Sequence, residues 1–156
     1  MMKVYLAGPV LGKDTSEAVD WRTISQDFLI KHNIIGISPL RCETPAADGT
    51  FQADAAKRWG TPQSIMWKNL FDVRNTDATL AYLPLALTKN RPSIGTLAEL
   101  GMAHALQKPI FLATDDPYLS NHPWIRVASI HTAATLEDVL NAVVELYTNH
   151  NGRPHI

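Results

Sequence analysis

Short apolar runs alternate with longer amphipathic segments along this chain of 156 residues. The runs are rich in Val, Ile, Leu and Ala, which predicts strands over residues 3–7, 34–37, 78–83 and 110–113 and a short fifth strand over 127–131. Apolar residues at helical spacing predict helices over residues 14–31, 62–76, 96–107 and 135–147. Residues 84–92 and 115–123 are expected to be loops.

Strands that alternate with helices predict an α/β fold, a three-layer doubly wound domain around a parallel five-stranded sheet. The expected strand order is the flavodoxin- or Rossmann-like 2-1-3-4-5, with a single domain over residues 1–148 and a frayed tail over 149–156. Ligands of such sheets bind beyond the carboxyl ends of the strands, where the strand order reverses. We therefore expect the Gly8-Pro9 turn to meet the loop of residues 84–96 at a ligand site.

Residues 40–62 show no clean period and are punctuated by proline and glycine. A loop of this length in a compact domain is usually functional or mobile. The segment carries aromatic and basic side chains, so we interpret it as a lid over the site. The alternative is a surface insertion without a role in binding.

Composition narrows the class of protein. Apolar residues make up 46% of the chain, charged residues 19%, and the net charge is −1, which fits a globular protein and gives no basic surface for a nucleic acid polymer or an anionic membrane. The first apolar run is too short for a signal peptide and no run reaches membrane length, so we expect a cytoplasmic location.

Neither a metal nor a cofactor is expected. The histidines are scattered without ligand spacing, and Cys42 is the single cysteine. No Gly-x-Gly-x-x-Gly motif follows the first strand, which argues against a dinucleotide.

The stretch from Ser93 to Gly101 carries the most chemical information. A loop of small residues enters a helix, so the backbone N–H groups near Gly95 and Thr96 suit an oxyanion or a sugar hydroxyl. Glu99 near the helix dipole is expected to stay ionised, as a nucleophilic carboxylate must. The alternative is a capping box, in which Glu99 reaches back to the N–H of Thr96.

Three blocks of sequence occur together: Lys3-Val4-Tyr5-Leu6-Ala7-Gly8-Pro9, then Asp77-Ala78 at the start of a strand, then Gly95-Thr96-x-x-Glu99-Leu100-Gly101 followed by Lys108-Pro109-Ile110. Together they resemble the nucleoside 2-deoxyribosyltransferase family, which includes the related 2′-deoxynucleoside 5′-phosphate N-hydrolases. The resemblance implies that Glu99 attacks C1′ of the deoxyribose and forms a covalent glycosyl-enzyme, which a second base or water resolves. It also implies that Tyr5 orients the nucleophile and that Gly8 lines the pocket; Tyr5 as a plain core aromatic is the alternative. Asp77, away from the site, is expected to be a structural turn residue.

Ser93 departs from the pattern of the transferases. Six residues before the nucleophile, enzymes that act on free nucleosides typically carry Asp, whereas the monophosphate hydrolases carry Ser. An Asp would repel a 5′-phosphate, while a serine hydroxyl beside helix N–H groups can donate to one. Ser93 therefore favours a monophosphate substrate, unless it only shapes the turn after Pro92.

Asn69 is a second departure. The family usually has an Asp here that helps to protonate the leaving base, and an amide cannot act as a general acid. Asp72 lies one helical turn further along and is a candidate substitute.

The resemblance also places His122 and Trp124 where family members reach into the site of a neighbouring subunit, which implies a homodimer or a higher homo-oligomer with shared sites. A lone surface histidine is the alternative for His122. Arg22 is expected to be a solvated helix charge.

The chain is thus expected to be an enzyme that cleaves the N-glycosidic bond of deoxynucleosides or their 5′-monophosphates. The leading hypothesis is a monophosphate N-glycosidase of nucleotide salvage. Base exchange between deoxynucleosides by a nucleoside 2-deoxyribosyltransferase is the first alternative. A nucleotide-binding module with weak turnover, which Asn69 favours, is the second.

Overall fold

The computed structural model describes residues 1–89, 91–148, 152 and 153. It contains a five-stranded parallel sheet with the order β2-β1-β3-β4-β5, which confirms the predicted fold class and strand order. The strands are β1 (Met2–Ala7), β2 (Ile34–Ile37), β3 (Ala78–Tyr82), β4 (Ile110–Ala113) and β5 (His131–Ala133). Most of the predicted frayed tail, residues 149–151 and 154–156, lies outside the described residues.

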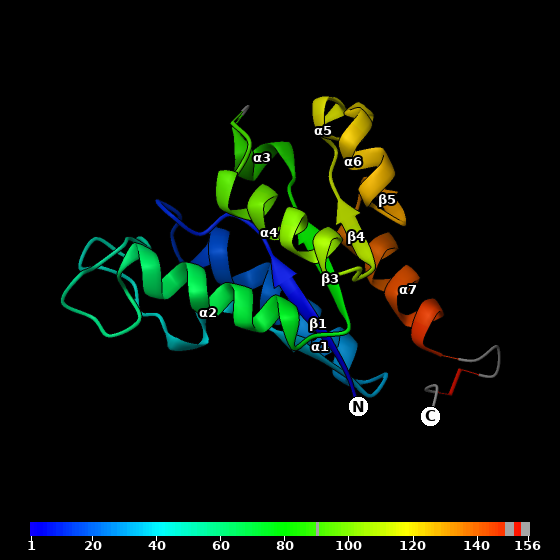
Figure 1. The fold of residues 1–156 in the computed structure, drawn as a ribbon, viewed down its shortest axis with the longest axis horizontal. Helices are drawn as coiled ribbons and strands as arrows, with labels where there is room; N and C mark the ends of the chain where they lie inside the picture. Colours follow the sequence, from blue (N-terminus) through cyan, green and yellow to red (C-terminus); the bar gives the residue numbers. More distant parts are fainter. Residues whose placement is uncertain (90, 149–151, 154–156) are drawn as a thin grey trace.

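Helices cover both faces of the sheet (Figure 1). They are α1 (Trp21–Ile30), α2 (Pro62–Arg74), α3 (Leu85–Thr88), α4 (Ile94–Ala105), α5 (Pro117–Asn121), α6 (Pro123–Ala128) and α7 (Leu136–Tyr147), with a π-helical turn at Ser16–Asp20 and a 3₁₀ turn, η2, at Pro39–Cys42. The side chains of α1 and α7 pack on one face, and those of α2, α4, α5 and α6 pack on the other.

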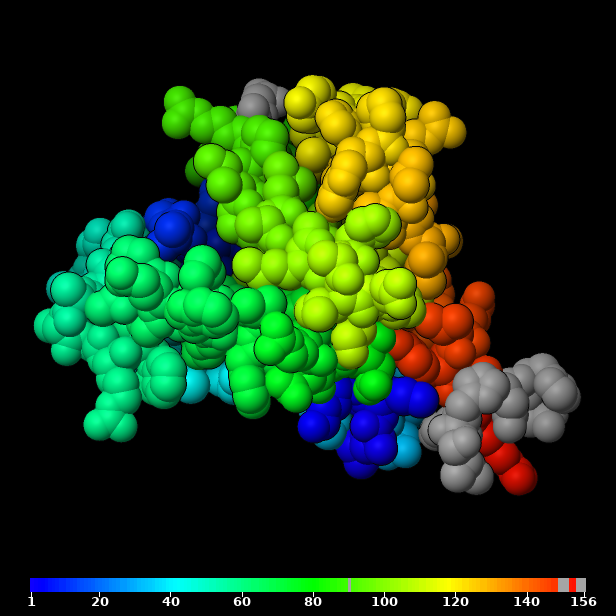
Figure 2. All heavy atoms as spheres, viewed as in Figure 1, coloured from blue at the N-terminus to red at the C-terminus, as the bar shows by residue number. Residues whose placement is uncertain are grey.

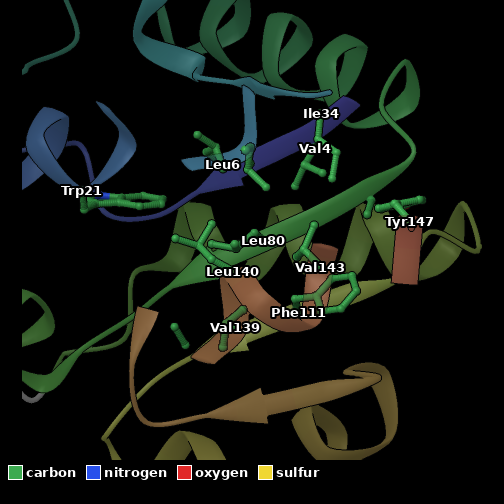
Figure 3. Close-up of a cluster of buried hydrophobic side chains, with 13 residues drawn as sticks. Val4, Leu6, Trp21, Ile34, Leu80, Phe111, Val139, Leu140, Val143 and Tyr147 are labelled. Carbon is green, nitrogen blue, oxygen red and sulfur yellow. The ribbon is translucent and has the colours of Figure 1, made fainter. Parts of the chain in front are cut away.

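Strand alternation decides which side chains face the site. Val4 and Leu6 of β1 point into the core beneath α1 and α7 (Figure 3). Tyr5 and Ala7 point the other way, toward α2 and α4. Tyr5 is fully buried there, on the same side of the sheet as the helix that carries Glu99.

Several predicted boundaries in the second half of the chain are wrong. Val127 belongs to α6, and the fifth strand begins only at His131. The expected loop over 115–123 contains α5, because the Asp116 side chain accepts from the N–H of Tyr118 and proline occupies the first turn. The short helix α3 lies within the other expected loop, over residues 84–92.

The segment over residues 43–61 is tied to the turn after β1. Phe51 is 4% exposed and packs with Ala18 and Leu40. Its N–H donates to the Lys13 carbonyl at 2.9 Å, and its carbonyl accepts from the N–H of Gly12 at 2.8 Å. The segment is therefore anchored at its midpoint; whether it closes as a lid stays a prediction.

Asp77 is the turn residue expected, since its carboxylate accepts from the N–H of Lys3 at 2.8 Å. No helix in the described part of the chain is both long enough and apolar enough to cross a membrane.

Gly8 directly follows β1, at a point where the chain has no room for a side chain. A Cβ there would lie 2.6 Å from Cζ2 of Trp21 and 3.2 Å from the carbonyl oxygen of Tyr82. We predict that Gly8→Ala lowers the free energy of unfolding by about 1–3 kcal/mol, because the Trp21 ring must leave its packed position. Urea denaturation measures the change.

The matched control is Gly101→Ala on α4, where an added Cβ meets no atom within 4 Å. This variant is expected to gain about 0.5–1 kcal/mol from helix propensity. Equal stability of Gly8→Ala and the unmodified protein would contradict the steric account.

Candidate active site

A cavity of about 450 Å³ lies at the reversal of strand order between β1 and β3. The turn after β1 and the loop before α4 meet there, as predicted from the expected strand order. One wall is formed by η2 and α2, and the others by the β1 turn, the α3–α4 loop and the start of α4. Of the predicted site residues, the cavity is lined by Gly8, Asn69, Ser93, Gly95, Thr96 and Glu99.

Glu99 lies in this cavity wall with 8% of its surface exposed. The Tyr5 hydroxyl donates to Oε1 of Glu99 at 2.8 Å. Nδ2 of Asn69 donates to the same oxygen at 2.9 Å. Within the described residues no donor contacts Oε2, so the side chain is fixed through one oxygen and the other is available to a ligand.

The capping-box interpretation of Glu99 is wrong. Helix α4 begins at Ile94, and its N-cap is Ser93, whose Oγ accepts from the N–H of Thr96 at 3.4 Å. The Ser93 and Thr96 hydroxyls also share a hydrogen bond of 2.8 Å. Because Ser93 caps the helix, Glu99 is free to reach Tyr5 and Asn69.

The expectation that Glu99 is fully ionised also needs correction. Burial raises the pKa of Glu99 to about 7, although hydrogen bonds from Tyr5 and Asn69 and the charges of Arg22 and Lys68 lower it. Desolvation therefore outweighs the stabilising partners, and the carboxyl is partly protonated near neutral pH. Burial, and then the Glu99 charge, raise the pKa of Tyr5, so Tyr5 stays a donor.

Arg22 is not the solvated charge that its place on a helix suggested. It is 1% exposed and donates from Nε to the Leu6 carbonyl at 3.2 Å and from a terminal nitrogen to the Gly8 carbonyl at 2.9 Å. It also donates to the Ala18 carbonyl, and its guanidinium lies 4.4 Å from the centre of the Trp21 ring. Burial lowers the pKa of Arg22 to about 10, which leaves it charged at neutral pH.

Lys68 determines which way the Asn69 amide faces. It is 7% exposed, and its Nζ donates to Oδ1 of Asn69 at 2.9 Å and to the Pro39 carbonyl. An ammonium group can only donate, so the amide oxygen must face Lys68 and the amide NH₂ must face Glu99. Nζ of Lys68 also lies 3.7 Å from Oε1 of Glu43, which lines the cavity.

Asp72 does not reach the cavity wall. It is 3% exposed and holds Arg41 through two hydrogen bonds of 2.5 Å. Both carboxylate oxygens of Asp72 are therefore engaged by Arg41. The position of Asp72 thus gives no support to its expected role as a substitute acid.

His122 and Trp124 also lie away from the cavity of this chain. His122 caps α6, with Nδ1 accepting from the Trp124 N–H at 3.3 Å, and both side chains are exposed. Their predicted contact with substrate requires a second subunit and stays a prediction.

Three basic residues on the cavity wall were not predicted as site residues. Lys13 donates to the Leu87 carbonyl at 2.6 Å, and Lys89 lies 3.7 Å from a carboxylate oxygen of Glu17. Arg91 lines the same wall, next to Ser93. Lys13 comes from the loop after β1, whereas Lys89 and Arg91 come from the loop between α3 and α4, so the fold brings the two loops together. In the described ranges, no group of three or more His, Cys, Asp or Glu side chains has the arrangement to hold a metal ion.

Comparisons with known proteins identify the family and the fold. The model of the nucleoside 2-deoxyribosyltransferase family matches residues 4–147. The chain is similar to a 2-deoxyribosyltransferase from Bacillus psychrosaccharolyticus, with a TM-score of 0.64 and 19% identity over 99% of both chains. No curated protein sequence gives a significant match.

Two other solved structures share the fold. A CMP N-glycosidase from Clostridium botulinum has a TM-score of 0.56 and 16% identity over 93% of this chain and 99% of its own. A molybdenum cofactor binding protein from Rippkaea orientalis has a TM-score of 0.59 and 15% identity over 94% and 98%. Because the fold serves such different functions, the site and the family match must carry the assignment.

The family match extends from β1 to the end of α7 and includes both Tyr5 and Glu99. Members of this family are enzymes that transfer deoxyribosyl groups or cleave N-glycosidic bonds. The matched region contains the buried carboxylate of Glu99, which Tyr5 orients in the cavity between β1 and β3. This chain belongs to the nucleoside 2-deoxyribosyltransferase family.

Proposed function

We propose that this chain hydrolyses the N-glycosidic bond of 2′-deoxynucleoside 5′-monophosphates through a covalent deoxyribosyl–Glu99 intermediate. The observation that carries the proposal is the arrangement around Glu99, where Tyr5 and Asn69 both donate to Oε1. This leaves Oε2 as the attacking atom. A single positioned carboxylate suits a transition state that resembles an oxocarbenium ion.

In the first step, Oε2 of Glu99 forms a bond to C1′ while the bond from C1′ to the base nitrogen breaks, and its electron pair leaves with the base. In the second step, a water oxygen attacks C1′ and releases Glu99 as a carboxylate, while the proton lost by water balances the one gained by the base. In both steps, the hydrogen bonds from Tyr5 and Asn69 to Oε1 hold the Glu99 carboxylate in position.

The part of the cavity at the N-terminus of α4 is suited to a phosphate. Ser93 stands at the N-terminus of α4, where backbone N–H groups and the helix dipole favour an anion. Lys13, Lys89 and Arg91 line the adjoining wall. Ser93 has no negative charge to repel a 5′-phosphate, and the surrounding cations attract one.

Base exchange is the second candidate. The likeness to the Bacillus psychrosaccharolyticus 2-deoxyribosyltransferase over 99% of both chains favours it. Both reactions share the first step and differ only in whether water or a second base attacks C1′. A binding module with weak turnover is the third candidate, because Asn69 has no proton to give to the leaving base.

We also propose a homodimer in which the partner's α6 completes the site. Exposed apolar side chains lie on α2 (Trp67 61% and Phe71 63%) and α6 (Trp124 42% and Val127 82%). Both helices lie on the face shown in Figure 2, where α4 runs between them. An exposed apolar surface of this kind is typical of a protein interface. A sedimentation mass of one chain, rather than two or more, would contradict the proposal.

A cytoplasmic place in nucleotide salvage fits this substrate class. Cys42 is a free, exposed thiol, which suits a reducing compartment.

The substrate class is tested by chromatography of reactions with deoxynucleosides and their 5′-monophosphates, each with and without a second free base. We predict free base from the monophosphates alone. Ser93→Asp should lower kcat/KM for monophosphates about 100-fold or more, because the new carboxylate repels the phosphate.

Asp is as good an N-cap as Ser, so Ser93→Asp should fold normally. Ser93→Ala removes the hydroxyl without adding charge and separates the two effects. A new nucleoside that forms only with acceptor base would favour the transferase. No base release by the unmodified protein and unchanged nucleotide binding by Glu99→Ala would favour the binding module.

The pH dependence of kcat/KM follows from Glu99, which faces Tyr5 of β1, Arg22 of α1, and Lys68 and Asn69 of α2. Because Glu99 must be ionised to attack and its pKa is about 7, the rate is expected to rise with pH and level off above 7. The Tyr5 hydrogen bond lowers the pKa of Glu99, so Tyr5→Phe should shift the rise in kcat/KM to higher pH. It should also reduce the plateau about 10- to 100-fold.

Tyr147→Phe is the matched control, because Tyr147 is a buried tyrosine in the core on the other face of the sheet. Tyr147→Phe should leave both the pH of the rise and the plateau of kcat/KM unchanged. A profile that falls with rising pH across this range would mean that Glu99 acts in its protonated form.

A further inference from the structure

The wall formed by η2 and α2 differs in character from the phosphate end of the cavity. It contributes two apolar side chains, Pro39 and Ile65, and two polar ones, Glu43 and Asn69. Glu43 and Glu99 are the two carboxylates that line the cavity in the described part of the chain. The mechanism above uses Glu99 and leaves Glu43 without a role.

The Asn69 amide is already half engaged within the protein. Its oxygen accepts from Lys68, and its NH₂ donates to Glu99. Glu43 is different, because a carboxylate has about four acceptor sites and the contact with Lys68, 3.7 Å from Oε1, occupies one side of it. Glu43 thus has the larger capacity on this wall to accept further hydrogen bonds.

Lys68 also bears on the charge state of Glu43. Burial raises the pKa of Glu43, and the Lys68 ammonium opposes this by favouring the carboxylate. Burial likewise lowers the pKa of Lys68, and Glu43 opposes that shift. Each partner favours the charged form of the other, so the contact with Lys68 favours the form of Glu43 that accepts hydrogen bonds.

The proposed function fixes where the base lies. With C1′ at Glu99 and the phosphate at Ser93 and the basic loop residues, the base is placed against the wall of η2 and α2, because Asn69 of that wall contacts Glu99. Pro39 and Ile65 supply apolar contact for a planar ring, and Glu43 is the acceptor at its edge.

We propose that Glu43 selects bases that carry an exocyclic amino group, cytosine at C4 or adenine at C6, over their keto counterparts. The inference rests on the proposed function for the location of the base. An amino group donates to the carboxylate. A keto oxygen at the same place turns lone pairs toward it and leaves a buried acceptor unpaired.

Two matched substrate pairs test this in the unmodified protein: dCMP against dUMP, and dAMP against dIMP. The two members of each pair differ in whether an amino group or a keto oxygen is attached at the same ring carbon. We expect kcat/KM to be roughly 10- to 100-fold higher for the amino member of a pair that is turned over. Equal rates within a pair, or faster release of the keto base, would overturn the inference.

Glu43→Gln is the diagnostic variant, since a glutamine amide can either donate or accept. It should bring the two members of a pair to within about threefold of each other. Glu137→Gln, an exposed change on α7, is the control and should keep the full preference. A preference that survives Glu43→Gln would assign the selection to another residue.

Equilibrium binding separates this inference from the proposed function. Calorimetry of dCMP and dUMP with the Glu99→Ala variant, which cannot form the covalent bond, reports selection without turnover. Tighter binding of dCMP with no base release by the unmodified protein would leave the role of Glu43 intact and refute the hydrolase. Base release without preference in either assay would do the reverse.

Discussion

The carboxylate of Glu99 is buried against β1, and the surrounding residues compensate for the water it has lost. An isolated carboxylate in such a place would be strongly disfavoured. Tyr5 and Asn69 each provide a hydrogen bond to one oxygen, and the charges of Arg22 and Lys68 act from a greater distance. The compensation is incomplete, so the pKa stays near 7. An incompletely stabilised carboxylate close to neutral pH is well suited to attack carbon.

Each of these partners depends on the fold for its own position. Tyr5 reaches Glu99 because strand alternation turns it away from the core of Val4 and Leu6. Asn69 presents its NH₂ because Lys68 occupies its oxygen. Arg22 remains charged in the interior because backbone carbonyls, including that of Gly8, accept its N–H groups. The turn at Gly8 thus serves both the cavity wall and the cation beneath it.

The parts of the fold that could be predicted are those with strong local signals. Residues 34–37 and 110–113 were predicted as strands with the observed bounds, because continuous apolar runs mark buried parallel strands. The edge strand β5 was predicted too early in the sequence, since two of its three residues are exposed and give no continuous apolar run. Helix α5 lies within an expected loop and α6 was not predicted as a helix, because Asp116 and His122 cap very short segments that begin with proline.

Among the site residues, Glu99, Tyr5 and Asn69 were predicted through a family resemblance, and the structure brings them into contact. Arg22, Lys68 and Glu43 were not assigned roles, because a charged residue on a helix or loop normally faces solvent. Their burial arises from contacts between segments far apart in sequence, such as Lys68 with Pro39 and Arg22 with Leu6. No local pattern encodes such contacts.

The claim on which the account depends is that Oε2 of Glu99 bonds to C1′. Rapid acid quench during turnover of a deoxynucleoside 5′-monophosphate, followed by peptide mass spectrometry, tests it most directly. The account predicts a deoxyribosyl phosphate adduct on the peptide that contains Glu99, present during turnover and absent when Glu99 is replaced by Ala. Base release at full rate with an adduct on another residue, or with none at any quench time, would contradict it.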